Sequence, residues 1–333
     1  MAAFTDQFLY RITGKQSVER LDPLVSRVVS NCCAWDKDTH TNRQLDFVWE
    51  TTCEKDLRER HNSAKVINKL HNSQIIESKS SLAYLQLLVD YPMLDTKVAY
   101  SSAEVEGWAK RRWYSASNTQ CETEDRDWWV VKASKGNGGR DVWVFNKSNH
   151  EKVISELPPN EEYVIQRYVN NPLLFRGKKF HFRCYSVMTA GGAALVYRNA
   201  FILSAGLDFD YKDDDMRKHV TNLSVNKRFA GHPGQVPCNL QNEYPEVFGV
   251  QTVVSIEIVE NYPFLILILL QVYVEIKRMW TAVVKAAMPY MQEQGSARHF
   301  EFFGIDIIAD TAGQCWLVEA NRCVNEVASA YLP

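Results

Sequence analysis

The sequence FFGIDIIADTAGQCWLVEAN at residues 302–321 decides the fold, because two apolar runs flank one short turn. Both runs favour β-strands, and TAGQ at 311–314 has the composition of a hairpin turn. Asp306 stands in the middle of the first strand, while Glu319 and Asn321 share one face of the second. Folding back at the turn brings Asp306 within about one register step of Glu319. We therefore predict a hairpin that carries two carboxylates and an amide close together.

These three side chains predict a metal site. Carboxylate and amide oxygens are the hard ligands that magnesium prefers, with water and substrate phosphates completing its shell. The alternative is a pair of charges at the rims of strand ends. A buried Asp306 would cost roughly several kcal/mol unless it is paired or coordinated, so we expect a divalent cation to compensate it. The expected metal ligands are Asp306, Glu319 and Asn321.

A strand with one cationic face is predicted upstream, where KFHFRCYSVM at 179–188 alternates with period two. The alternation places Lys179, His181 and Arg183 on one face and the phenylalanines on the other. Three basic groups in file indicate an anion above them, and the alternative is a merely exposed face. Arg198 could join this surface across a hairpin whose turn is AGGA at 190–193.

A glycine loop, SKGNGGRD at 134–141, joins two predicted strands, WWVVK at 128–132 and DVWVF at 141–145. The common phosphate loops instead run from a strand into a helix, so this loop fits neither pattern. A simple turn is one interpretation. The other is a triphosphate site, because Lys132 and Lys135 flank backbone N–H groups that the glycines leave unshielded.

A further polar group occurs in HVTN at 219–222, where His219, Thr221 and Asn222 offer hydrogen-bonding side chains. Ordinary turn chemistry is the alternative for these residues.

The composition predicts one globular unit of two or three subdomains. The 333 residues are 46% hydrophobic and carry 38 basic and 40 acidic side chains, a net charge of -2. Disorder is therefore excluded, and any recognition by charge must be local. The eight cysteines form no CxxC pair, and the N-terminus lacks the apolar core of a secretory signal, so we expect reduced thiols in a cytoplasmic protein. The apolar run at 263–276 is too short to span a membrane. We expect a monomer that binds neither nucleic acid nor membrane.

These motifs together resemble tubulin tyrosine ligase and the wider tubulin tyrosine ligase-like family of ATP-grasp enzymes. The resemblance covers roughly residues 60–325. The matching pieces are ESKSSL at 77–82, WVVKAS with its glycine loop at 129–139, VIQRYVNNPLLFRGKKFHFR at 164–183, VYRNAF at 196–201, HVTN at 219–222 and the 302–321 segment.

The resemblance implies an α+β fold of ATP-grasp architecture, with antiparallel sheets, flanking helices and ATP between a central and a C-terminal subdomain. The implied subdomains are residues 1–78, 79–165 and 166–333. The resemblance implies a magnesium site at Asp306, Glu319 and Asn321, and Arg183 and Arg198 as catalytic arginines. The implied ATP-binding residues are Lys79, Lys132, Lys135, Gly136, Gly138, Gln166, Arg167, Val169, Lys179, His181, His219, Thr221 and Asn222.

The implied activity is an ATP-dependent ligase that adds an amino acid, tyrosine or glutamate first, to a tubulin C-terminal tail through an acyl phosphate. Its partners would be tubulin and a free amino acid, with an association with microtubules. His181 and His219 are candidate bases for the incoming amine. KRRW at 110–113 is a candidate docking site for the acidic tail, with a solvated helix face as the alternative. Two other functions stay open: a ligase for a different carboxylate substrate, and an inactive protein that binds nucleotide or tubulin.

Three departures from the family pattern bear on this hypothesis. His181 stands where tubulin tyrosine ligase has an aspartate, which leaves the choice of substrate open. Residues 251–274 fill a region where the family continues directly toward a helix, and we interpret them as an insertion or a gene-model artefact. The sequence also ends at Pro333, shortly after the predicted metal motif, so we expect part of the final helix of the C-terminal subdomain to be missing.

Overall fold

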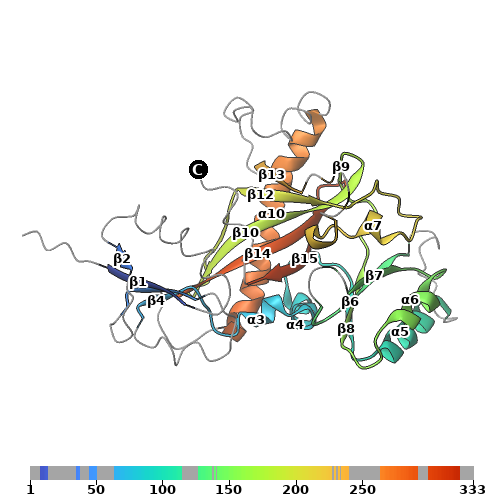
Figure 1. Ribbon diagram of the computed structural model, residues 1–333, viewed down its shortest axis with the longest axis horizontal. Helices are drawn as coiled ribbons and strands as arrows, with labels where there is room; N and C mark the ends of the chain where they lie inside the picture. The colour runs from blue at the N-terminus through green and yellow to red at the C-terminus, as the bar shows by residue number, and fades with distance from the viewer. Residues whose placement is uncertain are drawn as a thin grey trace, which may run out of the picture.

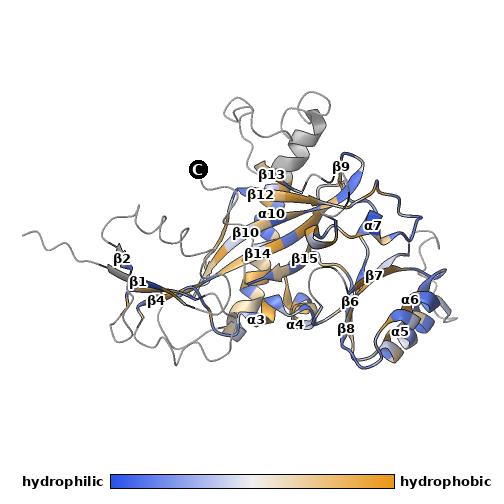
Figure 2. Cartoon of the chain, viewed as in Figure 1, coloured by the Kyte–Doolittle hydropathy of each residue, from blue (hydrophilic) through white to orange (hydrophobic). Residues whose placement is uncertain are grey.

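The computed structural model describes residues 8–13, 35–37, 45–50, 64–114, 127–136, 139, 141–226, 229, 232, 234–239, 263–291 and 299–322. Within these residues the strands form three sheets, which follow one another along the chain (Figure 1). The strands of the large sheet are mainly apolar, and the outer helices α5 (Ser102–Tyr114) and α6 (His150–Glu156) are mainly polar (Figure 2). Among the described helices, none combines the length and apolar character that crossing a membrane requires.

The N-terminal sheet is parallel, with strand order β2-β1-β3-β4. Its strands are β1 (Phe8–Thr13), β2 (Trp35–Lys37), β3 (Phe47–Glu50) and β4 (Val66–Ile67). The expectation of antiparallel sheets is wrong for this part of the chain. Parallel neighbours need a crossover connection of about a dozen or more residues, and here residues 14–34 separate β1 from β2 and residues 51–65 separate β3 from β4.

The small sheet is antiparallel, with order β5-β8-β6-β7. Its strands are β5 (Thr96–Ala99), β6 (Trp129–Ala133), β7 (Val142–Phe145) and β8 (Tyr163–Arg167). Helices α5 (Ser102–Tyr114) and α6 (His150–Glu156) cover one face and pack against Trp129 and Val131. Successive strand residues point to opposite faces, so Val130 and Lys132 are left for the other face. The predicted hairpin around the glycine loop is confirmed as β6–β7.

The large sheet is also antiparallel, with order β13-β12-β10-β14-β15, and β9 and β11 pair with β10. Its strands are β9 (Leu174–Phe175), β10 (Lys178–Thr189), β11 (Ala194–Val196), β12 (Asn199–Ser204), β13 (Gln235–Asn239), β14 (Phe300–Ala309) and β15 (Cys315–Asn321). The predicted β14–β15 hairpin is confirmed, and Asp306 lies directly opposite Glu319. A bulge follows this pair, between Asp306 and Ile307.

Helix α10 (Pro263–Met291) packs on one face of the large sheet. Its buried residues recur every three or four positions: Val272, Ile276, Met279, Val283 and Ala287. Trp280 is fully buried beside them and donates from its indole nitrogen to Ser186 Oγ at 2.6 Å. Of the suspected insertion, residues 251–262 lie outside the described residues and residues 263–274 belong to α10, so the insertion hypothesis stays a prediction.

Three short helical segments lie between β4 and β5 in the chain: α3 (Gln74–Glu77), α4 (Lys79–Leu85) and η1 (Gln86–Leu88). Ser78 caps α4, because its hydroxyl accepts a hydrogen bond from the Ser81 backbone N–H. The cap places Lys79 in the first turn of α4. The α+β class and the flanking helices are confirmed, while the subdomain boundaries 1–78, 79–165 and 166–333 remain predictions.

Candidate active site

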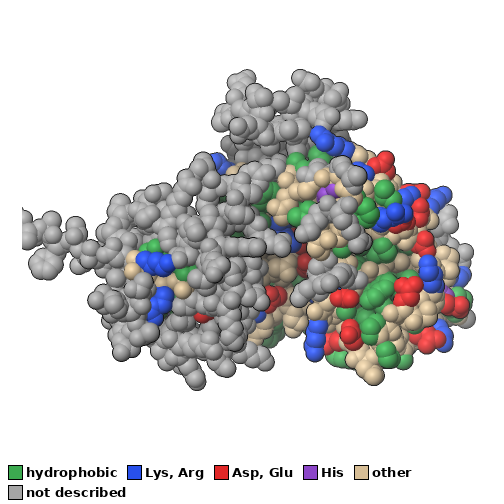
Figure 3. All heavy atoms as spheres, in the orientation of Figure 1, with side chains coloured by type: hydrophobic (Ala, Val, Ile, Leu, Met, Phe, Trp, Pro, Cys, Tyr) green, Lys and Arg blue, Asp and Glu red, His purple; other side chains and the backbone are tan. Residues whose placement is uncertain are grey.

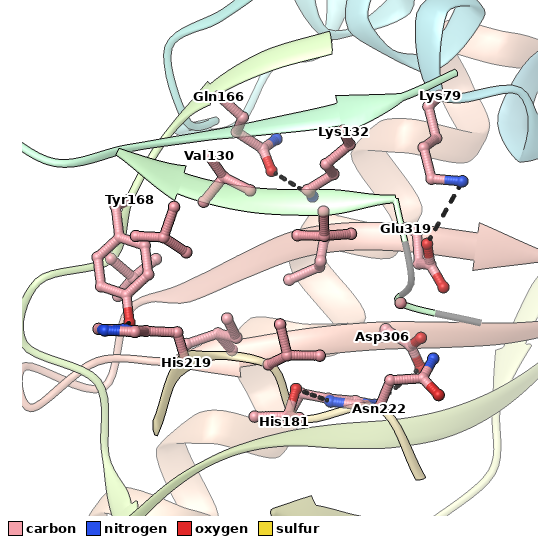
Figure 4. Close-up of a pocket in the computed structure, with 18 of the residues that line it drawn as sticks. Lys79, Val130, Lys132, Gln166, Tyr168, His181, His219, Asn222, Asp306 and Glu319 are labelled. Carbon is pink, nitrogen blue, oxygen red and sulfur yellow. Dashed lines mark hydrogen bonds and ion pairs between the residues drawn. The ribbon is translucent and has the colours of Figure 1, made fainter. Parts of the chain in front are cut away.

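A cavity of about 380 Å³ lies between the small and the large sheet (Figure 4). It has the size of a small-molecule site. Fifteen predicted site residues line it: Lys79, Lys132, Gly136, Gln166, Arg167, Val169, Lys179, His181, Arg183, His219, Thr221, Asn222, Asp306, Glu319 and Asn321. The structure therefore brings together residues that lie up to 242 positions apart in the sequence, from Lys79 to Asn321.

Part of the wall is apolar, and our sequence analysis did not predict it beyond Val169. The side chains come from both sheets and from the segments beside them: Leu94, Val130, Val142, Val144, Ile308 and Val318. Alternation along β6 could have identified Val130, since it shares a face with Lys132. An apolar wall beside cationic groups fits a ligand with a flat apolar part and an anionic part.

Two lysines hold the glycine-loop side of the cavity. Lys79 Nζ donates to the Gly136 carbonyl at 2.7 Å and lies 3.9 Å from Glu319 Oε2. Lys132 Nζ donates to Gln166 Oε1 at 2.9 Å. Gln166 is oriented in turn, because its amide nitrogen donates to Thr96 Oγ1 at 3.2 Å.

Two buried lysines add positive charge to the cavity. Burial lowers the pKa of Lys132 to about 8, and burial together with the nearby Lys132 lowers the pKa of Lys179 to about 7. Lys179 is 4% exposed, so the alternative of a solvent-exposed cationic strand face is wrong. In the described part of the chain, no carboxylate lies within ion-pair distance of either ammonium group. An anionic ligand would supply the missing charge.

Tyr168, which our sequence analysis missed, connects Lys179 to His219. The Lys179 ammonium lies 3.8 Å from the centre of the Tyr168 ring, a cation–π contact. The Tyr168 hydroxyl lies 2.7 Å from His219 Nδ1, and His219 Nε2 contacts the Asp213 carbonyl oxygen. Because a carbonyl only accepts, Nε2 carries the proton and Nδ1 accepts from tyrosine.

This arrangement argues against His219 as a base. Both ring nitrogens already have protein partners, and burial lowers the pKa of His219 to about 4. The side chain is therefore neutral at pH 7 and has no free nitrogen toward the cavity. Its position at the end of α7 (Met216–His219) makes it a support for Tyr168 instead.

The Asp306 carboxylate has Arg183 as its main partner. Arg183 forms a two-pronged ion pair with its carboxylate, in which Nη2 donates to Oδ2 at 2.8 Å and Nε donates to Oδ1. His181 Nε2 lies 3.4 Å from Oδ1, and His181 Nδ1 lies 2.6 Å from Thr221 Oγ1. Burial alone would raise the pKa of Asp306, but Arg183 and His181 outweigh it and hold the pKa below its usual range. Arg183 thus provides a compensation that we expected from a divalent cation, and the metal site itself stays a prediction.

The oxygen donors still fit a magnesium ion. Asp306 and Glu319 are paired across β14 and β15, and Asn321 Nδ2 donates to Glu319 Oε1 at 3.2 Å, which leaves the Asn321 amide oxygen available. Two carboxylates and one amide oxygen are the hard donors that this ion takes beside phosphate oxygens and water. Among the residues described, no three His, Cys, Asp or Glu side chains cluster as a metal site would require. The donor set therefore fits an ion shared with a phosphate ligand.

The glycine loop approaches the cavity closely. A Cβ at Gly136 would lie 2.7 Å from Asp141 Cβ, and one at Gly139 would lie 2.7 Å from Asn222 Cβ. Gly139 also has a φ of +71°, which favours glycine. Gly138 lies outside the described residues, and Lys135 is exposed and does not line the cavity.

Arg198 is the other predicted residue that the structure does not bring to the cavity. It lies between the end of β11 at Val196 and the start of β12 at Asn199, and its side chain is exposed. The two residues between the strands interrupt the alternation of side chains. Arg198 therefore does not share the face of the sheet on which Arg183 lies.

KRRW at 110–113 does not reach the cavity either. Helix α5 covers the opposite face of the small sheet, because Trp113 packs there against Trp129 and Phe145. Arg112 donates to the buried carboxylate of Asp127 at 2.9 Å, and Lys110 pairs with Glu106 at 2.6 Å. On the face in Figure 3, acidic and basic side chains are interspersed over this part of the molecule. This segment therefore supports the fold, and the docking interpretation is wrong for Arg112.

The fold and the site together define a class: an α+β protein with a cation-lined cavity and paired carboxylates between two antiparallel sheets. Within that class the chain belongs to the tubulin-tyrosine ligase family, whose model matches residues 57–323. The match spans the small sheet, the large sheet and every residue that lines the cavity.

Several curated proteins are similar to this chain. The tubulin polyglutamylase TTLL5 of Mus musculus is 27% identical over 215 residues, which cover 60% of this chain and 15% of the relative. The tubulin monoglycylase TTLL3 of Mus musculus is 24% identical over 217 residues, or 59% of this chain and 21% of the relative. The probable tubulin polyglutamylase ttll-9 of Caenorhabditis elegans is 27% identical over 210 residues, or 61% and 47%. The chain thus spans less than half the length of each of these relatives.

Proposed function

We propose that this protein is an ATP-dependent ligase of ATP-grasp architecture that adds an amino acid to the C-terminal tail of tubulin. The observation that carries the proposal is the meeting of two buried lysines, which form no ion pair with the described residues, with a carboxylate pair in one cavity between two sheets. Membership of the tubulin-tyrosine ligase family and relatives named as polyglutamylases support tubulin as substrate and glutamate before tyrosine as the added residue. The proposal includes a cytoplasmic location on microtubules.

The cavity supports ATP as the bound nucleotide. Its apolar wall around Val130 and Ile308 suits the adenine, and Gln166 offers an amide beside it. The phosphates would lie toward Lys79, Lys132 and the glycine loop, which contacts the cavity wall so closely at Gly136 and Gly139 that neither position has room for a Cβ atom. Magnesium would be held by Asp306, Glu319 and Asn321, where it would offset phosphate charge.

The proposed reaction has two steps. A carboxylate oxygen of the acceptor takes the γ-phosphoryl group of ATP, which releases ADP and leaves an acyl phosphate. The neutral amine of the added amino acid then attacks the carbonyl carbon, the amide bond forms, phosphate leaves and the amine loses a proton. Lys79, Lys132 and Lys179 stabilise the transferred charge, and Arg183 lies where it can stabilise the oxyanion or the amino acid's own carboxylate.

His181 is the candidate base that remains, since its Nε2, unlike either ring nitrogen of His219, has no hydrogen-bond partner among the described residues. Arg198, being exposed, is proposed to meet the protein substrate outside the cavity.

The experiment that tests the function measures incorporation of labelled glutamate, tyrosine and glycine into purified tubulin with ATP and Mg²⁺. The control is Glu319→Gln, which keeps the shape of the side chain but removes its charge. We expect incorporation of one amino acid, lost in the variant and in EDTA. Intact Mg²⁺-dependent ATP binding without incorporation would contradict tubulin as the substrate. Absence of ATP binding would contradict the nucleotide site itself.

A further inference from the structure

A second charged network lies beside the cavity, and the proposed function does not use it. It joins the start of β14 and the residue after β15 to helix α3 and to the segment before this helix. We call it the anchor network, and its members are Lys69, Ser73, Glu77, Glu301 and Arg322.

The inner half of the network is the carboxylate of Glu301, at the start of β14. Glu301 is 0% exposed, yet its oxygens accept three hydrogen bonds. They come from Lys69 Nζ at 3.2 Å, the Leu70 backbone N–H at 3.2 Å and Ser73 Oγ at 2.7 Å. The network therefore fixes the segment before α3 to the large sheet.

The outer half is the ion pair between Glu77 and Arg322, just after β15. Arg322 Nε donates to Glu77 Oε2 at 2.7 Å, and Nη1 donates to Ser73 Oγ at 3.0 Å. The Arg322 backbone N–H also donates to Glu77 Oε1, at 3.4 Å. Glu77 thus holds both the side chain and the main chain of this residue.

The positions of these two residues connect the network to the site. Glu77 lies two residues before Lys79, and Arg322 directly follows Asn321. The same two segments meet again inside the cavity, where Lys79 Nζ lies 3.9 Å from Glu319 Oε2. A shift of Arg322 away from Glu77 would move the Asn321 main chain and with it two of the proposed metal ligands.

We propose that Glu77 and Arg322 are positioning residues that hold Glu319 and Asn321 in place for a magnesium-bound nucleotide. This inference rests on the proposed function, because it requires nucleotide binding in the cavity. Partners that orient metal ligands without touching the metal affect metal affinity strongly, and their loss weakens it by about 10- to 100-fold.

The test measures binding of a non-hydrolysable ATP analogue by calorimetry, in EDTA and across a Mg²⁺ titration, with wild type, Glu77→Gln and Arg322→Gln. We expect both variants to need about 10- to 100-fold more Mg²⁺ for half-maximal enhancement of nucleotide binding, with unchanged affinity in EDTA. A purely structural role would weaken binding equally in both conditions.

Two further variants control the experiment. Glu106→Gln removes an exposed ion pair on α5, far from the cavity, and should match wild type in every condition. The double reversal Glu77→Arg with Arg322→Glu restores opposite charges. It should need less Mg²⁺ for half-maximal enhancement of nucleotide binding than Glu77→Gln or Arg322→Gln.

Superimposable Mg²⁺ titrations of Glu77→Gln and wild type would overturn the inference. So would an equal loss of affinity with and without Mg²⁺. Failure of the proposed function gives a different result. A wild-type protein that binds no nucleotide would overturn both the proposed function and this inference. A wild-type protein that binds Mg²⁺ and nucleotide but modifies no tubulin would contradict the proposed function alone, and the Mg²⁺ titrations would still decide this inference.

Discussion

At the scale of single residues, the cavity is defined by charges whose burial the protein compensates unequally. Asp306 has Arg183 and His181 beside it, whereas the Lys179 ammonium has the Tyr168 ring and no carboxylate partner among the described residues. A bound phosphate would supply the partner that Lys179 lacks, and a substitution of Arg183 would remove the partner of Asp306. The first two predictions concern these two changes.

The first prediction concerns the pH dependence of nucleotide binding. The pKa of Lys179 is lowered to about 7, so this side chain is largely neutral at pH 8.5, and a bound phosphate would favour its charged form. Binding above pH 7 must then take up a proton, and affinity should fall by up to about tenfold per pH unit between pH 7 and 9.

Calorimetry in two buffers of different ionisation enthalpy measures this proton uptake directly. Lys132, whose pKa is lowered to about 8, contributes in the same direction at the upper end of the range. The Lys179→Met variant should bind more weakly and show a flatter profile. Equal uptake in Lys179→Met and wild type would contradict the assignment.

The second prediction concerns stability. Arg183→Met leaves the Asp306 carboxylate buried without its main partner, and it should lower the free energy of unfolding by about 3–5 kcal/mol at pH 7. The folded pKa of Asp306 is depressed, so its stabilising contribution is present above the usual aspartate pKa of about 3.9 and is lost as the pH falls.

Urea denaturation at pH 7 and at acid pH checks both statements, and the difference between variant and wild type should shrink at acid pH. The exposed Arg278, which pairs with Glu275 on α10, provides a control: Arg278→Met should change stability by no more than about 1 kcal/mol. Equal effects of the two substitutions would refute the role of Arg183.

At the scale of elements, the large sheet separates two environments. One face carries Lys179, His181 and Arg183 toward the cavity, and the other carries Phe180, Phe182 and Cys184 into the core under α10. The helix therefore stabilises the strand that bears the functional groups without contacting the cavity.

The third prediction tests that support. Trp280 is fully buried, donates to Ser186 and lies with its ring centre 5.4 Å from that of Phe303. Trp280→Ala should cost about 3–5 kcal/mol of stability, because it leaves a cavity and an unpartnered hydroxyl. Thr281→Ala, at the next and exposed position, should stay within about 0.5 kcal/mol. Thermal or urea unfolding of both variants measures the contrast.

Sequence patterns predicted the elements better than the contacts between them. Alternation along β10 assigned the face of Lys179 and Arg183 correctly, and the β14–β15 turn predicted the pairing of Asp306 with Glu319, because both rules act over a few residues. Arg198 was misplaced because parity does not survive the break between β11 and β12. Tyr168, Glu77 and Arg322 were missed as functional residues, since their roles depend on partners that only the tertiary structure brings near.

At the scale of the whole molecule, the cavity belongs to neither sheet alone. Lys132 and Gln166 come from the small sheet, and His181 and Asp306 come from the large one (Figure 4). A nucleotide between them would contact both sheets at once and stabilise their relative placement.

The fourth prediction follows from this shared site. Saturating ATP and Mg²⁺ should slow amide hydrogen exchange in β6 and β8 as well as in β10 and β14, and at 100 times Kd should add about 2.7 kcal/mol to the free energy of unfolding. Mass spectrometry of exchanged peptides measures the pattern, with Glu319→Gln as the variant that should show weaker protection. Protection confined to one sheet would contradict a ligand bound between them.

The pairing of β10 with β14 also has a consequence for synthesis on the ribosome. Arg183 and Asp306 sit opposite each other but are 123 residues apart, so the central strand of the large sheet emerges long before its neighbour. At about 5–20 residues per second, β10 waits roughly 6–25 s with one edge open. An open edge is a template for pairing with other chains. The nascent protein should therefore need chaperone protection over this interval, and neither Asp306 nor Glu319 can contribute to a metal site until β14 and β15 have emerged.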